Sequence, residues 1–330
     1  MPLTAPYPLV PVPEFEGRPV YMQDWFVAIA ARGRTLRVEV VEDRAVVGSL
    51  SCSLYSNPLG MRQGYNLPWA HLGGPIIESD VDPLARRKLI KRLIAQLPTN
   101  RSYFLTLSNE EDFKTFLASG FESNLEDNFV IPADQTATWE RRLSKMSARH
   151  LRTGARALDV LTFEPSAFIR MYNDHLVMRR RKPYADLTIA SDILAEASRR
   201  GQARVIAARR RDTGEFDAAV ACLWDSASCY YWMTTRRPAI NGATVPHQGA
   251  IKLLMHAAIK HAHAKGLTFD FDGVATDKIA NLYAGMGGNK SVRYRVMRQT
   301  TCERLVGIVR SPLKTALRNT IGRLVSLKLN

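Results

Sequence analysis

The chain has 330 residues, 46% of them apolar and 8% aromatic, which is ordinary for a globular protein and long enough for two domains with sizeable cores. Lys and Arg number 46 against 31 Asp and Glu, so the net charge of +15 favours a polyanionic partner: cofactor phosphates, RNA or an acidic membrane surface. The cysteines form no Cys-x-x-Cys pair, which argues against zinc or a disulfide framework and for reduced thiols. The sequence shows no signal peptide or membrane span, so we expect a cytoplasmic protein without a bound metal.

The N-terminal part follows a proline-rich, extended lead at residues 1–18. Alternating apolar residues at Leu36–Val41 and Ala45–Leu54, joined by Asp43-Arg44, predict a β-hairpin. Leu67–Ile77 predicts another strand, broken by glycine. Pro83–Leu97 predicts a helix. Tyr103–Phe121 predicts a strand and a second helix that ends at Gly120-Phe121, and Asp127–Ile131 predicts the returning strand.

A similar order recurs toward the C-terminus. The second copy begins near Val160, and Phe168, Tyr172 and Leu176 predict a helix. Strand patterns follow at Ala203–Ala208, Asp217–Cys222 and Cys229–Thr235. The helix Gly249–Lys265 then leads to a strand, Thr268–Gly273, a short helix that starts at Thr276-Asp277, a stop at Gly285, Gly287 and Gly288, and a returning strand, Val292–Met297. This recurrence predicts two copies of one α/β fold, and two unrelated α/β segments are the alternative.

Several of these features occur in an order that resembles the Fem family, the tandem acyltransferases related to the peptidoglycan aminoacyl-transferases and their acetyltransferase cousins. The matched positions within residues 19–298 are Gln23, Gly73-Gly74-Pro75, Phe269, Asp270, Phe271, Gly273 and Gly287-Gly288. The resemblance implies two tandem GNAT-like α/β domains with mixed central sheets flanked by helices. It also implies that the second domain and the cleft between the domains handle the acyl donor and the acceptor. We therefore expect domains at 19–137 and 160–305, a basic linker helix at 138–159 and a tail at 306–330.

The expected linker helix carries a row of cations. At 3.6 residues per turn, five of them share one face without an acid among them: Arg141, Lys145, Arg149, Arg152 and Arg156. Such a face suits the phosphates of tRNA, a lipid-linked pyrophosphate or a coenzyme, and an ordinary solvated face is the alternative. The Fem-family aminoacyl-transferases carry a long coiled-coil insertion implicated in tRNA contact, and this sequence has none, which argues against tRNA.

A basic, glycine-containing loop precedes the helix at Gly249–Lys265. In the GNAT fold that the resemblance implies, the corresponding loop binds the pyrophosphate of coenzyme A, and the N–H groups and dipole of a helix start favour phosphate. The resemblance thus implies an acyl-CoA co-substrate such as acetyl-CoA. The expected contacts are Arg236, Arg237, Gly242, Gln248 and Gly249.

Acyl transfer to an amine or hydroxyl needs a proton acceptor and a polarised carbonyl. Asp270 and Asp272 share one face of their predicted strand, and either is a candidate base; structural carboxylates are the alternative. His247, in the loop, is a candidate base or hydrogen-bond donor to a phosphate, or an ordinary surface histidine. Tyr283 is a candidate acid for the leaving group, or a core residue.

The tail alternates apolar residues with a basic stripe at Arg310, Lys314 and Arg318, which predicts a helix that either attaches the protein to the anionic inner membrane face or packs on a domain. Three functions remain open. The first is transfer from acyl-CoA to an amine or hydroxyl of a small molecule or cell-envelope precursor, such as a lipid-linked acceptor. The second is an aminoacyl-tRNA-dependent transferase, and the third is a non-catalytic scaffold that binds anionic lipid or nucleic acid.

Overall fold

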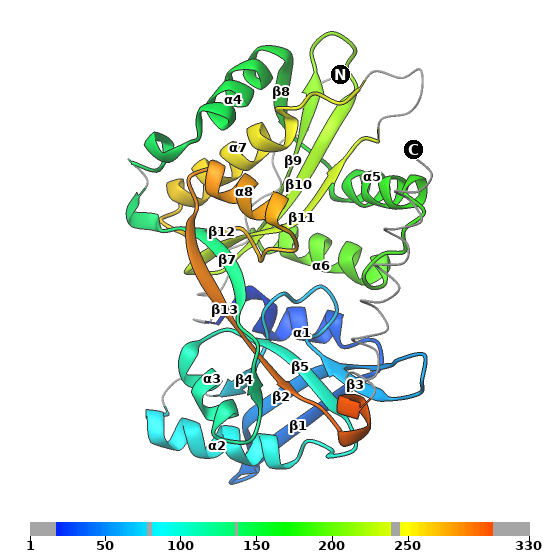
Figure 1. Cartoon of the computed structure of the whole chain (residues 1–330), viewed down its shortest axis with the longest axis vertical. Coiled ribbons are helices and arrows are strands. Elements are labelled where there is room, and N and C mark those ends of the chain that lie inside the picture. Colours follow the sequence, from blue (N-terminus) through cyan, green and yellow to red (C-terminus); the bar gives the residue numbers. More distant parts are fainter. Residues whose placement is uncertain (1–17, 78–80, 136–137, 239–244, 306–330) are drawn as a thin grey trace, which may run out of the picture.

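A computed structural model describes residues 18–77, 81–135, 138–238 and 245–305 (Figure 1). The tail at 306–330, most of the lead and Gly242 lie outside these residues. The N-terminal elements are η1 (Val20–Met22), α1 (Asp24–Ala30), β1 (Thr35–Glu42), β2 (Ala45–Ser56), β3 (Arg62–Tyr65), β4 (Pro75–Ile77), α2 (Pro83–Ala95), β5 (Ser102–Leu107), α3 (Glu110–Leu117), β6 (Glu122–Ser123) and β7 (Glu126–Ile131).

The elements after β7 are η2 (Ala133–Gln135), η3 (Trp139–Arg142), α4 (Lys145–Ala157), β8 (Leu158–Thr162), α5 (Pro165–Met178), α6 (Leu187–Arg199), β9 (Ala203–Arg210), β10 (Phe216–Trp224), β11 (Ser228–Arg236), α7 (Ala250–Ala264), β12 (Thr268–Asp270), α8 (Asp277–Gly285) and β13 (Asn289–Arg298). They build a mixed sheet in the order β1-β2-β3-β5-β13-β7-β12-β11-β10-β9-β8, with β4 and β6 off this path.

The two halves of this sheet repeat one pattern. In the N-terminal half, β1, β2 and β3 are antiparallel neighbours, β3 and β5 are parallel, and β5 pairs with β13 in antiparallel orientation. The C-terminal half repeats these orientations: β9, β10 and β11 are antiparallel neighbours, β11 and β12 are parallel, and β12 pairs with β7 in antiparallel orientation. The helices α2 and α7 precede the equivalent strands β5 and β12, and α3 and α8 follow them. The predicted repeat is therefore confirmed.

The strand that completes each half comes from the other half. β7 follows α3, yet it pairs with β12, and β13 follows α8, yet its second part, Tyr294–Arg298, pairs with β5. The first part of β13, Asn289–Arg293, pairs with β7 itself. Figure 1 shows these two strands crossing between the lower and upper halves of the molecule. The exchange makes one continuous sheet of what the sequence suggests are two, and it places β7 and β13 side by side at the junction.

Local signals in the sequence explain the helix ends next to the exchanged strands. The side chain of Asn109 caps α3, and that of Thr276 caps α8, each by accepting a backbone N–H of the first turn. Gly120 and Gly287 follow the two helices with φ of +86° and +85°, a left-handed conformation that favours glycine. The capping residues and the stopping glycines are thus equivalent in the two copies.

Helices cover the sheet and enclose three apolar clusters. In the N-terminal half, α2 and α3 pack on one face around Leu93, Tyr103 and Phe116. In the C-terminal half, α7 and α8 enclose a cluster that includes Phe269, while α5 and α6 cover the other face together with α1. Because α1 contacts α6, the cluster around Phe26 joins the two halves.

Some predicted elements differ from the structure. Leu67–Ile77 is a loop that ends in β4, because Trp69 at φ +63° and Gly74 at φ +125° turn the chain. The linker helix begins after the Ser144 cap and ends where β8 starts, so Arg141 lies on η3 rather than on the helix. The strand at Thr268 ends at Asp270, because Asp272 adopts φ +67°. The helix α6 was not predicted.

Candidate functional site

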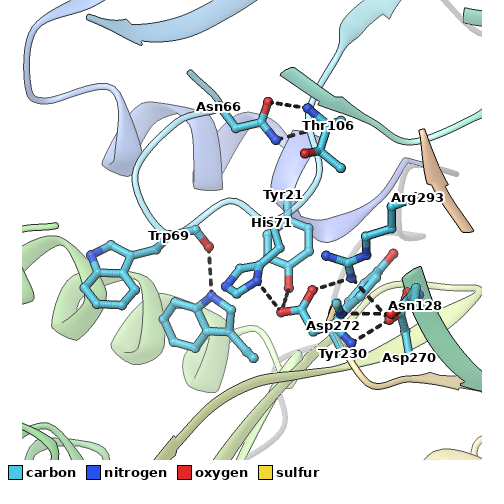
Figure 2. Close-up of polar contacts among 12 residues, drawn as sticks. Tyr21, Asn66, Trp69, His71, Thr106, Asn128, Tyr230, Asp270, Asp272 and Arg293 are labelled. Carbon is cyan, nitrogen blue, oxygen red and sulfur yellow. Dashed lines mark hydrogen bonds and ion pairs between the residues drawn. The ribbon is translucent and has the colours of Figure 1, made fainter. Parts of the chain in front are cut away.

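Six polar side chains meet where the two halves join, and we call them the junction cluster (Figure 2). They come from segments far apart in the sequence: the start of the N-terminal half, the loop before β4, the two exchanged strands, and the end of β12. The members are Tyr21, His71, Asn128, Asp270, Asp272 and Arg293.

Asp272 is the most tightly held member, with a side chain that is 1% exposed. Its Oδ1 accepts from Arg293 Nη2 at 2.5 Å, and its Oδ2 lies 2.8 Å from His71 Nδ1. The Tyr21 hydroxyl also donates to Oδ2, at 3.3 Å. Burial alone would raise the pKa of Asp272, but His71 and Arg293 outweigh burial and hold this pKa below its ordinary value. Asp272 is therefore a fixed carboxylate.

Asp270 has a different environment. Its Oδ1 accepts from Asn128 Nδ2 at 3.1 Å, from the backbone N–H of Asp272 at 2.7 Å and from Arg293 Nη2 at 3.2 Å. Within the described part of the chain, the side chain of Asp270 makes these three hydrogen bonds, and all of them go to Oδ1. Its Oδ2 is therefore left for another partner. Burial raises the pKa of Asp270; the Arg293 charge opposes this and the Asp272 charge adds to it. The two carboxylates are thus held at separated pKa values, as in sites that divide an acid or base role between two groups.

The surroundings of the cluster fix its geometry. The loop that carries His71 is tied to both halves: Asn66 exchanges hydrogen bonds with the backbone of Thr106 at 3.2 Å, and Trp232 Nε1 donates to the carbonyl of Trp69 at 2.9 Å (Figure 2). Trp69 Nε1 in turn donates to the Asp186 carbonyl at 2.8 Å.

Tyr21 lies against Tyr230, with ring centroids 4.9 Å apart. Burial, and then the charge of Asp272, raise the pKa of Tyr21 well above its ordinary value, so its hydroxyl keeps its proton and acts as a donor.

The sheet opens beside Asp270. β11 and β12 pair in parallel at Ser228–Tyr230 with Thr268–Asp270, and β12 then ends. The rest of β11, from Tyr231 to Arg236, has no neighbouring strand on that side among the described residues. The opening therefore has Asp270 at its closed end and the loop before α7 at the other.

The residues of that loop make contacts within the protein. Arg237 pairs with the fully buried Asp217 at 2.8 Å and with Glu215 at 3.2 Å, and Arg236 Nη2 donates to the Pro246 carbonyl at 2.8 Å. The Nε atoms of both arginines are nevertheless buried, and these two guanidinium N–H groups have no acceptor among the described residues.

The N-cap residue of α7 supplies no side-chain cap, and the first turn of the helix has no acidic residue. Its N-cap is the predicted residue Gly249, where an added Cβ would lie 2.4 Å from the His150 carbonyl oxygen of α4. Glycine at this position is thus required by the close approach of α4 to α7. Gln248, also predicted, is exposed beside it.

Two predicted catalytic residues lie outside the cluster. His247 makes its contacts at the start of α7: its backbone N–H donates to Asp217, and its Nδ1 accepts from the Gly249 N–H at 3.0 Å. Tyr283 is 8% exposed and packs on Phe271, with ring centroids 4.6 Å apart. Burial raises its pKa strongly, so this phenol keeps its proton.

The cations of the predicted linker helix are exposed. Lys145, Arg149, Arg152 and Arg156 lie on α4 and Arg141 on η3, and none of the five forms an ion pair with another described residue. Their charge is therefore uncompensated next to the start of α7.

Sequence reasoning missed Tyr21, His71, Asn128 and Arg293. Arg293 is separated from Asp270 by 23 residues, Asn128 by 142 and Tyr21 from Asp272 by 251, so no local pattern could group them. The one available signal was a charged residue, Arg293, inside the predicted returning strand that follows the two aspartates. The described residues contain no group of three metal-ligating side chains, and none of their helices is long and apolar enough to cross a membrane.

Comparison with known proteins assigns the class. Residues 133–278 match the family model of the acetyltransferase (GNAT) domain, and no curated protein matches the chain. The segment at residues 133–278 therefore resembles a GNAT acetyltransferase domain, which supports an acyltransferase enzyme, and the chain as a whole has a Fem-like GNAT fold.

Three solved structures show the likeness of fold. FemX aligns with a TM-score of 0.55 and 10% identity, covering 80% of this chain and 88% of that one. The C-terminal domain of a proposed lysylphosphatidylglycerol synthetase from Agrobacterium fabrum has a TM-score of 0.57 and 11% identity, covering 86% and 89%. L-PGS from Bacillus licheniformis has a TM-score of 0.53 and 11% identity, covering 83% and 87%.

Proposed function

We propose that the C-terminal half transfers an acyl group from an acyl-CoA donor to an amine or hydroxyl of an acceptor that reaches the junction cluster. The observation that carries this proposal is the opening between β11 and β12, which ends at a carboxylate with a raised pKa. The match of residues 133–278 to a GNAT acetyltransferase domain supports the donor class.

The loop before α7 fits the phosphates of such a donor. Helix-start N–H groups without a side-chain cap attract anions, and the unsatisfied Nε–H groups of Arg236 and Arg237 add two donors. Lys252 adds a cation in the first turn, and burial lowers the pKa of this lysine. A phosphate there would satisfy groups that the protein leaves unpaired. The donor supplies an activated thioester, and a backbone N–H of β11 facing the opening would polarise its carbonyl.

In this proposal the acceptor's nitrogen or oxygen bonds to the acyl carbon while the C–S bond of the thioester breaks. Asp270 takes the acceptor's proton through Oδ2, and that proton ends on the departing coenzyme A thiolate. A base works best with a pKa near the working pH, and burial moves Asp270 in that direction. Asp272 stays ionised and holds Arg293 and His71 in place, so it is a positioning residue.

A second candidate function is transfer from an aminoacyl-tRNA. The unpaired cations of α4 favour it, because a row of exposed cations without acidic partners suits a phosphate backbone. FemX and L-PGS share the fold, which is compatible with this donor but does not assign it. The acceptor in either case would be a small molecule or a lipid-linked precursor, with peripheral membrane attachment through residues 306–330 as a further proposal.

Thermal-shift titration with coenzyme A and with deacylated tRNA separates the two donors, because a ligand that binds the native state raises its melting temperature. We expect coenzyme A to stabilise the wild type and Arg236→Gln to lose most of this stabilisation. The matched control is Arg34→Gln, since Arg34 is exposed in the N-terminal half and forms no ion pair among the described residues. No shift with coenzyme A, together with a salt-sensitive shift with tRNA, would replace the first function by the second.

A further inference from the structure

A basic cavity lies in the N-terminal half, away from the proposed acyl-transfer site. It has a volume of about 620 Å³ and forms where β3 and β5 begin and β13 ends. We call it the arginine pocket; its lining includes Arg62, Arg101, Arg298, Thr99, Thr300 and Cys302.

The three guanidinium groups of the pocket lack acidic partners. None of them forms an ion pair with a carboxylate in the described ranges of the chain. The Nε atom of Arg101 is buried and has no hydrogen-bond partner there. A buried donor without an acceptor is rare in native proteins and calls for an explanation such as a bound ion.

Arg298 is fixed in position before any ligand arrives. Its guanidinium lies 5.1 Å from the ring centroid of Tyr103 and 4.9 Å from that of Phe121, and Nη2 donates to the Leu97 carbonyl at 3.4 Å. Burial lowers the pKa of Arg298, which shows that its charge is poorly compensated. The aromatic rings hold the group, and a negative charge in the pocket would compensate it.

The carboxylate next to the pocket in sequence is engaged elsewhere. Glu303 follows Cys302 directly, but it is 8% exposed, and its Oε1 accepts a hydrogen bond from the Gln63 side chain of β3. Its Oε2 is buried and has no hydrogen-bond partner among the described residues. Its charge therefore does not neutralise the arginines by direct pairing.

We propose that the arginine pocket binds a small ligand through a phosphate or pyrophosphate group. Planar guanidinium groups match phosphate oxygens with paired hydrogen bonds, and the volume lies within the range of small-molecule sites. The pocket is separate from the junction cluster, because Arg298 follows Arg293 by five residues on β13, about 17 Å along an extended strand.

Isothermal titration calorimetry with inorganic phosphate, pyrophosphate and glycerol phosphate, against chloride at equal ionic strength, tests this proposal. We expect binding by the wild type, weakened about tenfold or more by Arg101→Gln and by Arg62→Gln, since a charged hydrogen bond contributes that much. Arg62 is exposed, so its variant should fold normally, and Arg34→Gln serves as the control for lost charge. Strong pyrophosphate binding with weak phosphate binding would identify a diphosphate ligand, and the glycerol phosphate arm reports a monoester.

Cys302 gives a second readout at the pocket itself. Cys302 is exposed, whereas Cys52, Cys222 and Cys229 are buried. A reagent that forms a mixed disulfide with free thiols should therefore modify Cys302 first. We expect the favoured phosphate ligand to slow this modification in the wild type and not in Arg62→Gln. Unchanged anion binding in both Arg62→Gln and Arg101→Gln, or no anion binding by the wild type, would overturn the proposal.

Discussion

Replacing the two carboxylates of the junction cluster by asparagine should change protein stability in different ways. The sign follows from the pKa shifts. A lowered folded-state pKa means that ionised Asp272 stabilises the fold above the unfolded-state pKa of about 3.9, and that this stability is lost as the pH falls through the folded-state pKa. A raised folded-state pKa means that ionised Asp270 destabilises the fold at neutral pH.

The contacts give the magnitudes. Asp272→Asn removes the charge that Arg293 contacts at 2.5 Å and His71 at 2.8 Å. Breaking a buried ion pair typically costs about 3–5 kcal/mol. Because Arg293 keeps Asp270 at 3.2 Å, we expect a loss near the lower end, about 3 kcal/mol. In Asp270→Asn the new amide oxygen can still accept from Asn128 and from the Asp272 N–H, so stability should change by less than about 1 kcal/mol.

Denaturant unfolding at neutral pH and initial rates of acyl transfer measure the two effects together. We expect Asp270→Asn to lose about two to four powers of ten in rate while remaining stable. The control is Asp127→Asn on β7, whose pair with Lys290 at 3.0 Å is exposed and should contribute at most about 1 kcal/mol. If Asp270→Asn were strongly destabilised or retained near-normal turnover, Asp270 would not be the base.

Three further outcomes follow from the structure. Changing Arg149 and Arg152 to Glu should weaken the binding of a polyanion and reduce the dependence of its affinity on salt concentration, as measured by titration at several salt concentrations. If that dependence were unchanged, the cationic face of α4 would be an ordinary solvated face. Gly249→Ala should lower unfolding free energy by about 1–3 kcal/mol because its Cβ would lie 2.4 Å from a carbonyl oxygen, whereas Gly33→Ala, with no atom within 4 Å, should be nearly neutral. The transfer rate should rise with pH as Asp270 loses its proton, at a pH above the ordinary carboxyl range, and Asp270→Asn should remove this rise.

Much of the fold was predictable because its signals are local. The alternation of Phe269 and Phe271 with aspartates, the Thr276 cap and the glycines after the helices all act within a few residues of their position in the chain. The structure contains the predicted hairpin, both strand–helix–strand units and the helix α7 in these places.

The junction cluster was predictable only in part. The two aspartates stand out in sequence because charged residues end an apolar strand, but the partners that set their pKa values arrive through the strand exchange and the loop before β4. Pairing between segments more than a hundred residues apart leaves no local pattern. For the same reason the sequence could not show that Arg237 is engaged by Asp217 of β10.

The exchange of β7 and β13 has a consequence for how the chain is made. During synthesis, β5 emerges almost two hundred positions before its partner Tyr294–Arg298, so the N-terminal sheet has an open edge until β13 has been made. Open strand edges are templates for association with other chains. A chain that ended between α4 and β12 would have β5 paired with β3 alone, its other edge open, and β7 without either of its partners. Neither copy of the repeat therefore completes its sheet from its own strands alone.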